Sequence, residues 1–142
     1  MQSLQVAFVV LLGAVCATAF FTEEQHDVAK MLADSCHKEL GGDLPEDFAT
    51  KMRHGDLTLN SEISKCTIQC IFAKVGYTDE NGVINREKLV ASLSKGNPVE
   101  KAEQFADECK ANEGESKCDK AFSLYQCYHK NKSIFAQDPP KA

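Results

Sequence analysis

Six cysteines constrain this chain more than any other feature of its sequence: Cys36, Cys66, Cys70, Cys109, Cys118 and Cys127. A seventh, Cys16, lies in an apolar N-terminal segment that we expect to be removed. An even number of cysteines in a small exported chain indicates a disulfide framework. Zinc is the competing interpretation, but the spacing of Cys66 and Cys70 and the nine-residue steps after Cys109 match no common zinc pattern. We therefore predict three disulfides and no metal.

The N-terminal segment has the features of a signal peptide. Residues Val6 to Ala19 are apolar, and the first charged side chain is Glu23. The run is shorter than the roughly 20 apolar residues of a transmembrane helix. The sequence Ala17-Thr18-Ala19 supplies a small-x-small cleavage pattern, although no Lys or Arg precedes the run. We predict that residues 1–19 are a signal peptide, and that residues 20–142 form one secreted domain of 123 residues.

The charge pattern and the missing motifs exclude several functions. The 16 basic and 21 acidic residues give a net charge of −5, and the lysines form no stripe, so nucleic acid is not an expected partner. The chain contains no G-x-S-x-G, no H-E-x-x-H and no Gly-rich phosphate loop, so we expect neither an enzyme nor a cofactor. The segment around Gly82 imitates a calcium loop, but Tyr77 and Lys88 occupy positions that require carboxylates.

Hydrophobic periodicity and helix caps predict six helices and no strand. The third is apolar on nearly every side and is therefore expected at the centre of the fold. The tail, residues 131–142, contains Pro139-Pro140 and is not expected to be helical there. The predicted helices run from the capping box Thr22–Gln25 to Gly41, from Pro45 to Gly55, from Asn60 or Ser61 to Val75, from Asn85 through Leu93, from the cap Asn97 and first-turn Pro98 through Cys109, and from Cys118 through Tyr128.

The positions of the cysteines on these helices limit how they pair. Cys66 and Cys70 are four residues apart, so they point the same way and are poorly placed to bond each other. Cys118 and Cys127 are nine residues apart, which places them on opposite sides of one helix. Each of the four must bond another segment, and several of the 15 possible connectivities remain open.

The spacing Cys36-x29-Cys66-x3-Cys70-x38-Cys109-x8-Cys118-x8-Cys127 resembles the six-cysteine signature of insect odorant-binding proteins. The x3 and the final x8 are its most diagnostic intervals. The resemblance covers residues 36–127. It implies a compact, disulfide-stapled, six-helix domain that encloses an apolar pocket. It also implies the pairing Cys36–Cys70, Cys66–Cys118 and Cys109–Cys127.

The resemblance further implies a carrier of odorants, pheromones or related small hydrophobic molecules in an extracellular fluid such as sensillar lymph. A receptor or a membrane surface would be its partner at release, and it would be a monomer or a weak dimer. Two alternatives stay open: a non-olfactory carrier in seminal, salivary or haemolymph fluid, and a disulfide-rich protein ligand or inhibitor without a cavity. Candidate ligand-binding residues are Phe48, Met52, Leu57, Leu59, Ile63, Ala73, Leu89, Leu93, Phe105, Phe122, Tyr125, Ile134 and Phe135.

Four further expectations concern the binding site and its surroundings. The hydroxyl of Tyr77 or Tyr125 would orient a polar end of a ligand, and no arginine awaits a carboxylate. Ile134 and Phe135 would bring the tail to the pocket. His129 lies near the end of the sixth helix, where the helix dipole favours its charged form, so acid would loosen the ligand. Asn131 begins an exposed N-glycosylation sequon.

Overall fold

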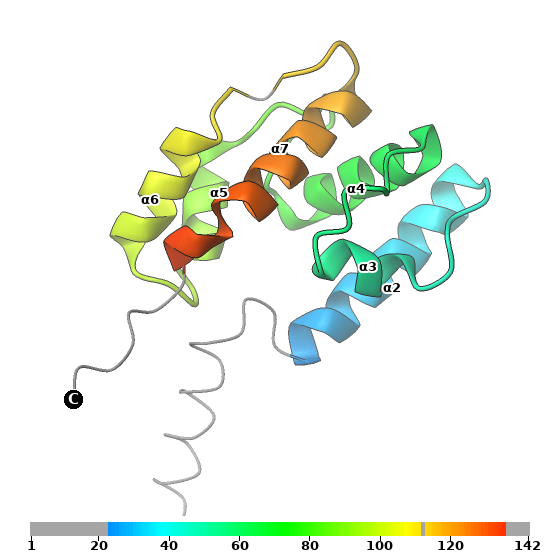
Figure 1. Ribbon diagram of the computed structural model, residues 1–142, viewed down its shortest axis with the longest axis horizontal. Helices are drawn as coiled ribbons and strands as arrows, with labels where there is room; N and C mark the ends of the chain where they lie inside the picture. The colour runs from blue at the N-terminus through cyan, green and yellow to red at the C-terminus, as the bar shows by residue number, and fades with distance from the viewer. Residues whose placement is uncertain (1–22, 112, 136–142) are drawn as a thin grey trace, which may run out of the picture.

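The computed structural model describes residues 23–111 and 113–135. The predicted signal peptide, residues 1–19, lies outside this range. In the described part, the all-α prediction is confirmed: the only β pairing is an isolated bridge between Thr78 and Ile84. None of the described helices is both long and apolar enough to span a membrane. The elements are α2 (Glu23–Leu40), α3 (Phe48–Arg53), α4 (Glu62–Val75), α5 (Arg86–Leu93), α6 (Val99–Glu108), α7 (Lys117–Asn131) and the 3₁₀ helix η1 (Lys132–Phe135), as Figure 1 shows.

Short polar side chains define where three of the helices begin. Ser61, Asn85 and Ser116 each accept a hydrogen bond from a backbone N–H three residues later, which satisfies a donor that the first turn leaves unpaired. Gly76 ends α4 with a φ of 86°, a left-handed conformation that glycine adopts at little cost. The predicted bounds of the third and fourth helices are confirmed.

Two predicted helix starts are wrong. Pro45 lies outside α3, which begins only at Phe48, after Asp47 turns the chain with a φ of 55°. Asn97 does not cap α6. Its side-chain amide donates instead to the carbonyl oxygen of Leu93 at 3.0 Å, so it satisfies the end of α5, and Pro98 occupies the cap position. At Asn97, a contact with the preceding helix outweighs the local helix signal; at Pro45, the left-handed turn at Asp47 delays the start of the helix.

Helix α4 is central, as its apolar pattern predicts, and it packs against both α2 and α7. Three of its buried residues, Ser64, Thr67 and Gln69, are nevertheless polar, and all three are hydrogen-bonded. The hydroxyl of Ser61 donates to that of Ser64 at 2.9 Å. The hydroxyl of Thr67 donates to the carbonyl oxygen of Ile63 at 2.7 Å. The side-chain amide of Gln69 donates to the backbone carbonyl oxygen of Glu80 at 3.3 Å. Buried polar groups of this kind cost little stability, because their hydrogen bonds replace those to water.

Two apolar clusters form the interior. The first lies among α2, α3, α4 and α7 and includes Phe48, Ile68 and Phe122. The second lies among α5, α6, α7 and η1 and includes Leu89 and Phe105. Helix α7 contributes to both clusters. In Figure 1, α5 and α6 lie on one side of α4 and α7, and α2 and α3 lie on the other.

Three disulfides connect four of the six described α-helices. Cys36–Cys70 joins α2 to α4, Cys66–Cys118 joins α4 to α7, and Cys109–Cys127 joins the end of α6 to α7. This is the pairing that the cysteine spacing implies by resemblance. In the chain-entropy model each bridge stabilises the fold by about 3–4 kcal/mol. Helices α3 and α5 carry no disulfide.

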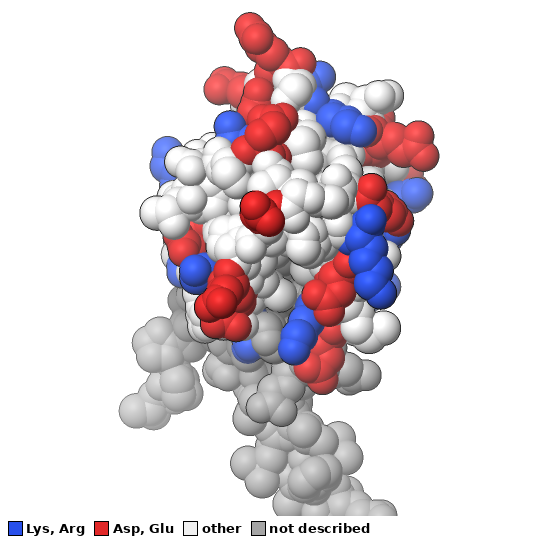
Figure 2. All heavy atoms as spheres, turned by 90° about the vertical axis from the view of Figure 1, so that its right-hand side faces the viewer, with Lys and Arg blue, Asp and Glu red and all other residues white. Residues whose placement is uncertain are grey.

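The charged side chains are distributed over the surface. Exposed ion pairs such as Arg86–Asp107, 2.8 Å apart, and Lys74–Glu39, 2.9 Å apart, contribute little to stability because solvent screens them. On the face that Figure 2 shows, lysines, arginines and acidic residues lie mostly around the edge and leave a largely uncharged area in the middle. The visible face therefore presents no concentrated charge of one sign.

Candidate ligand-binding cavity

A cavity of about 50 Å³ lies where the two apolar clusters meet. Met52 belongs to the first cluster and Phe105 to the second, and Phe72 packs against both. Side chains from α3, α4, α5, α6 and α7 therefore share one wall. The residues on this wall are Met52, Phe72, Tyr77, Leu89, Leu93, Phe105, Leu124, Tyr125, Tyr128 and His129.

Five of the thirteen predicted ligand-binding residues lie on this wall: Met52, Leu89, Leu93, Phe105 and Tyr125. The other eight are elsewhere. Leu57 is 47% exposed. Helical periodicity shows which face of a helix is apolar, but it does not show whether that face meets a cavity or a packed core. Phe48, Leu59 and Phe122 fill the first cluster, Ile134 and Phe135 pack in the second, and Ile63 and Ala73 are half-buried.

The sequence analysis misses four wall residues, Phe72, Leu124, Tyr128 and His129, as ligand-lining groups, and it includes Tyr77 only for its hydroxyl. Helical periodicity could have identified two of these residues, Tyr128 and His129. His129 is one turn beyond Tyr125 on α7, and Tyr128 is one turn beyond Leu124, so each pair shares a face of the helix.

The hydroxyl of Tyr125 ties α7 to the end of α3. It donates to the carbonyl oxygens of Met52 and Asp56, at 3.1 and 3.2 Å. Burial, with a smaller contribution from the charge of Asp56, raises the pKa of Tyr125 above its usual value. Its proton is therefore held in the fold at neutral pH.

The other two tyrosines of the wall are also protonated. Burial raises the pKa of Tyr77, whose hydroxyl is hydrogen-bonded to Ser92. Burial likewise raises the pKa of Tyr128, with a further contribution from Tyr77. The three phenols therefore give the wall polar atoms without negative charge.

The imidazole of His129 is packed against two of these tyrosines. Its centroid lies 4.7 Å from that of Tyr125 and 4.7 Å from that of Tyr128, with edge-on geometry in both contacts. Burial, together with the charge of Lys132, lowers the pKa of His129 from 6.5 to about 4, although the backbone of Met52 opposes the shift. The helix dipole, which was expected to favour the charged form of His129, is therefore outweighed by the cost of burial.

The tail packs behind the cavity wall. The ring of Phe135 is buried, with its centroid 5.4 Å from that of Phe105 and 6.4 Å from that of Tyr128. Phe135 therefore supports two wall residues without lining the cavity itself. Residues 136–142 lie outside the described part of the chain.

Asn131 is the last residue of α7 and is half-buried, so the predicted exposure is wrong for Asn131 itself, although Lys132 and Ser133 of the sequon are exposed. Its side-chain nitrogen, the atom to which a glycan would be attached, donates to the carbonyl oxygen of Cys127 at 2.9 Å. Helix α7 includes Asn131, which was predicted to belong to the tail.

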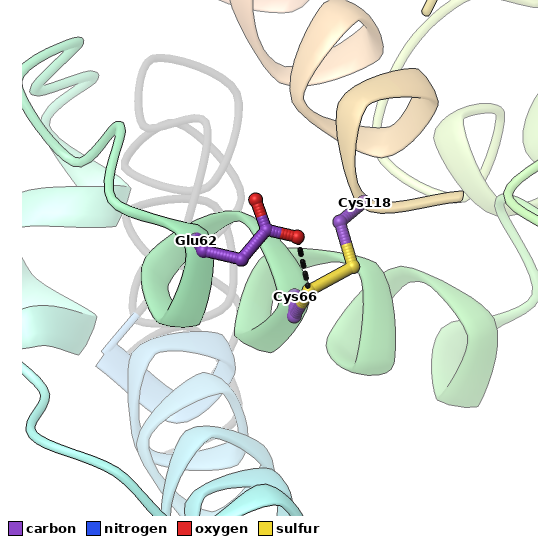
Figure 3. Close-up of side chains that lie close together, drawn as sticks. All are labelled: Glu62, Cys66 and Cys118. Atoms are coloured by element: carbon purple, nitrogen blue, oxygen red, sulfur yellow. Dashed lines mark hydrogen bonds between the residues drawn. A yellow bond between two sulfur atoms is a disulfide. The ribbon is translucent and has the colours of Figure 1, made fainter. Parts of the chain in front are cut away.

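One cluster of potential metal ligands is instead a disulfide beside a carboxylate. Glu62, Cys66 and Cys118 lie close together, and Figure 3 shows the bond between the two sulfurs. An oxygen of Glu62 lies 3.5 Å from the sulfur of Cys66. A disulfide sulfur carries no thiolate charge for a metal ion, so this geometry gives no reason to expect one.

Comparison with known proteins identifies the family. The PBP/GOBP family model matches residues 18–131. The chain is 28% identical over 127 residues to odorant-binding protein 10 of Aedes aegypti, covering 89% of this chain and 90% of that protein. It is 32% identical over 126 residues to general odorant-binding protein 56a of Drosophila melanogaster, covering 89% and 87%.

A solved structure agrees with these sequence matches. The fatty acid binding protein OBP56a from the oral disk of the blowfly Phormia regina superposes with a TM-score of 0.64 and 32% identity, covering 80% of this chain and 96% of that one. The chain belongs to the PBP/GOBP family, the odorant-binding proteins of insects. The resemblance inferred from the cysteine spacing is thereby confirmed.

Proposed function

We propose that the protein is a secreted carrier that holds small hydrophobic molecules in the cavity between α3 and α7. The observation that carries this proposal is the wall itself: nine of its ten residues are aliphatic, thioether or aromatic side chains, and they come from five helices and the turn after α4 to line one cavity. An apolar ligand gains about 25 cal/mol for each Å² of apolar surface that it removes from water there. Reversible binding of an apolar ligand, with no bond made or broken, explains why these residues line the cavity.

The extracellular fluid and the release partner are finer parts of the same proposal. We infer export directed by residues 1–19, passage through a fluid such as sensillar lymph, and release near a receptor or a membrane surface. The secreted product should have the mass of residues 20–142. Expression in olfactory tissue would support the olfactory role, and expression confined to seminal, salivary or haemolymph sources would support the alternative.

Displacement of a fluorescent apolar probe tests the carrier function directly. Leu93→Phe adds volume to a buried wall residue and should weaken probe binding by about tenfold or more, because the cavity is small and overpacked sites resist filling. Leu57→Phe is the matched control, since the same change falls on an exposed side chain away from the cavity. Binding that is equal in both variants, with unchanged circular dichroism, would place the ligand elsewhere.

A further inference from the structure

Among the described residues, the wall of the cavity offers no positive charge to an anionic ligand at neutral pH. Its ten residues include neither lysine nor arginine. His129 is the only basic side chain among them, and at neutral pH its imidazole is uncharged, because burial lowers its pKa to about 4. A carboxylate that enters such a space loses its hydration and finds no countercharge, which costs several kcal/mol per ion in proteins.

Part of the hydrogen-bonding capacity of the wall is already used within the fold. The proton of Tyr125 is donated to the backbone of Met52 and Asp56, and the hydroxyl of Tyr77 is bonded to Ser92. A carboxylate only accepts hydrogen bonds and needs several donors. A phenol oxygen that donates its proton still has lone pairs, so a ligand hydroxyl can donate to it.

We propose that this cavity takes uncharged apolar molecules, including those that end in a hydroxyl group, and rejects the carboxylate form of fatty acids. This inference rests on the proposed carrier function and adds the chemical class of the ligand's head group. It separates the chain from the blowfly relative, which is described as a fatty acid binding protein.

Lys132 is the charged group whose field reaches His129, and its position limits what it can do for an anion. It lies in η1, and its side chain is exposed. A carboxylate paired with Lys132 would remain at the surface in water, where such pairs contribute little. The lysine therefore offers no route for a carboxylate into the interior.

Two ligands with the same nine-carbon chain test the proposal. We expect 1-nonanol to displace a neutral fluorescent probe at a concentration about tenfold or more below that of nonanoate at pH 7.5. At pH 5 the acid begins to protonate whereas His129 stays neutral, so nonanoate should gain several-fold in affinity and nonanol should not change. Equal or stronger binding of nonanoate at pH 7.5 would overturn the proposal.

Variants identify where the preference arises. Met52→Lys places an amine on the wall and should raise the affinity for nonanoate, whereas Leu57→Lys, on an exposed residue, should not. A folded Met52→Lys protein whose affinity for nonanoate does not rise contradicts the proposal. If circular dichroism shows that Met52→Lys is unfolded, Leu93→Lys is used in its place. Lys132→Gln should leave both affinities within about twofold. A selective loss for nonanoate would instead assign the head group to Lys132 and overturn the proposal.

Binding of the neutral fluorescent probe tests the carrier function separately from the head-group selectivity. A chain that fails to bind any neutral apolar probe is not a carrier of the proposed kind. A chain that binds the probe and prefers nonanoate is a carrier whose head-group selectivity is the reverse of the one proposed.

Discussion

The backbone of Gly55 packs directly against the imidazole ring of His129. Gly55 has a φ of +80°, and a Cβ at this position would lie 2.8 Å from Cγ of His129. The contact joins the turn that follows α3 to the cavity face of α7. Because residue 55 has no side chain, the imidazole has room to lie on the cavity wall.

Replacing Gly55 with alanine should therefore destabilise the fold in two ways. A left-handed backbone costs a residue with a Cβ about 1–2 kcal/mol, and displacement of the buried ring adds about 1 kcal/mol or more. Gly41→Ala is the matched control, because Gly41 has a φ of +70° with nothing within 4 Å of its would-be Cβ. Urea denaturation should give a larger loss for Gly55→Ala. Equal losses would mean that the contact with His129 costs nothing.

Acid should weaken the fold through His129 in a defined pH window. Above pH 6.5 the imidazole is neutral in the folded and the unfolded chain; between 6.5 and about 4 the unfolded chain binds a proton that the folded chain resists. Stability therefore falls as pH is lowered through this window and stops falling below about 4. Tyr125, Tyr128, Lys132 and the carbonyl of Met52 face the ring, and none supplies a negative charge.

The size of this effect follows from the partial burial of the ring. We expect about 1–2 kcal/mol, below the value for the full shift in pKa, because solvent screens a half-buried side chain. Denaturation at several pH values for the native chain and for His129→Gln isolates it, since the carboxylates are common to both. Parallel curves between pH 6.5 and 4 would show that His129 does not titrate differently in the folded state.

Tyr125→Phe should cost about 1–2 kcal/mol in the free energy of unfolding, because the carbonyls of Met52 and Asp56 lose a shared donor in a buried place. The ring remains on the cavity wall, so binding of an apolar probe should change little. Thermal unfolding and probe titration of the same variant measure the two effects separately. A Tyr125→Phe protein that keeps its stability but loses probe binding would show that the hydroxyl serves ligand binding and not the fold.

Phe135→Ala should destabilise the protein by about 2–3 kcal/mol and weaken probe binding, because the ring of Phe135 supports Phe105 and Tyr128 from behind. Ser133→Ala, on an exposed residue of the same 3₁₀ helix, is the control and should change neither property. Truncation after Asn131 should act like Phe135→Ala and leave the helical circular dichroism intact. If truncation leaves the affinity unchanged, the described part of the tail has no role in binding.

The parts of the fold that could be predicted from the sequence are those decided by neighbours along the chain. Ser61, Asn85 and Gly76 mark helix ends because each acts within a few residues of itself. Asn97 was placed wrongly for the opposite reason: its side chain bonds back to Leu93 at the end of the previous helix, and a local motif does not reveal which of two helices an amide will serve.

The cavity was harder to predict because it depends on contacts between distant segments. Met52 and His129 face the same space although they lie on different helices far apart in sequence. The pKa of His129 depends on how deeply α7 is covered, and the sequence of α7 alone shows only the helix end and its dipole. Leu57 and Phe48 are as apolar as Met52, and only packing separates the exposed, the core and the wall residue.

Helices α3 and α5 contribute Met52, Leu89 and Leu93 to the cavity wall, and neither is held by a disulfide. Local opening requires the least free energy where few covalent and buried constraints act, so these two short helices should exchange their amide hydrogens sooner than α4 and α7. Dissociation of a bound molecule would then require local opening of α3 or α5. We therefore expect the disulfides to govern the stability of the domain and motion of α3 or α5 to govern the rate at which a ligand leaves.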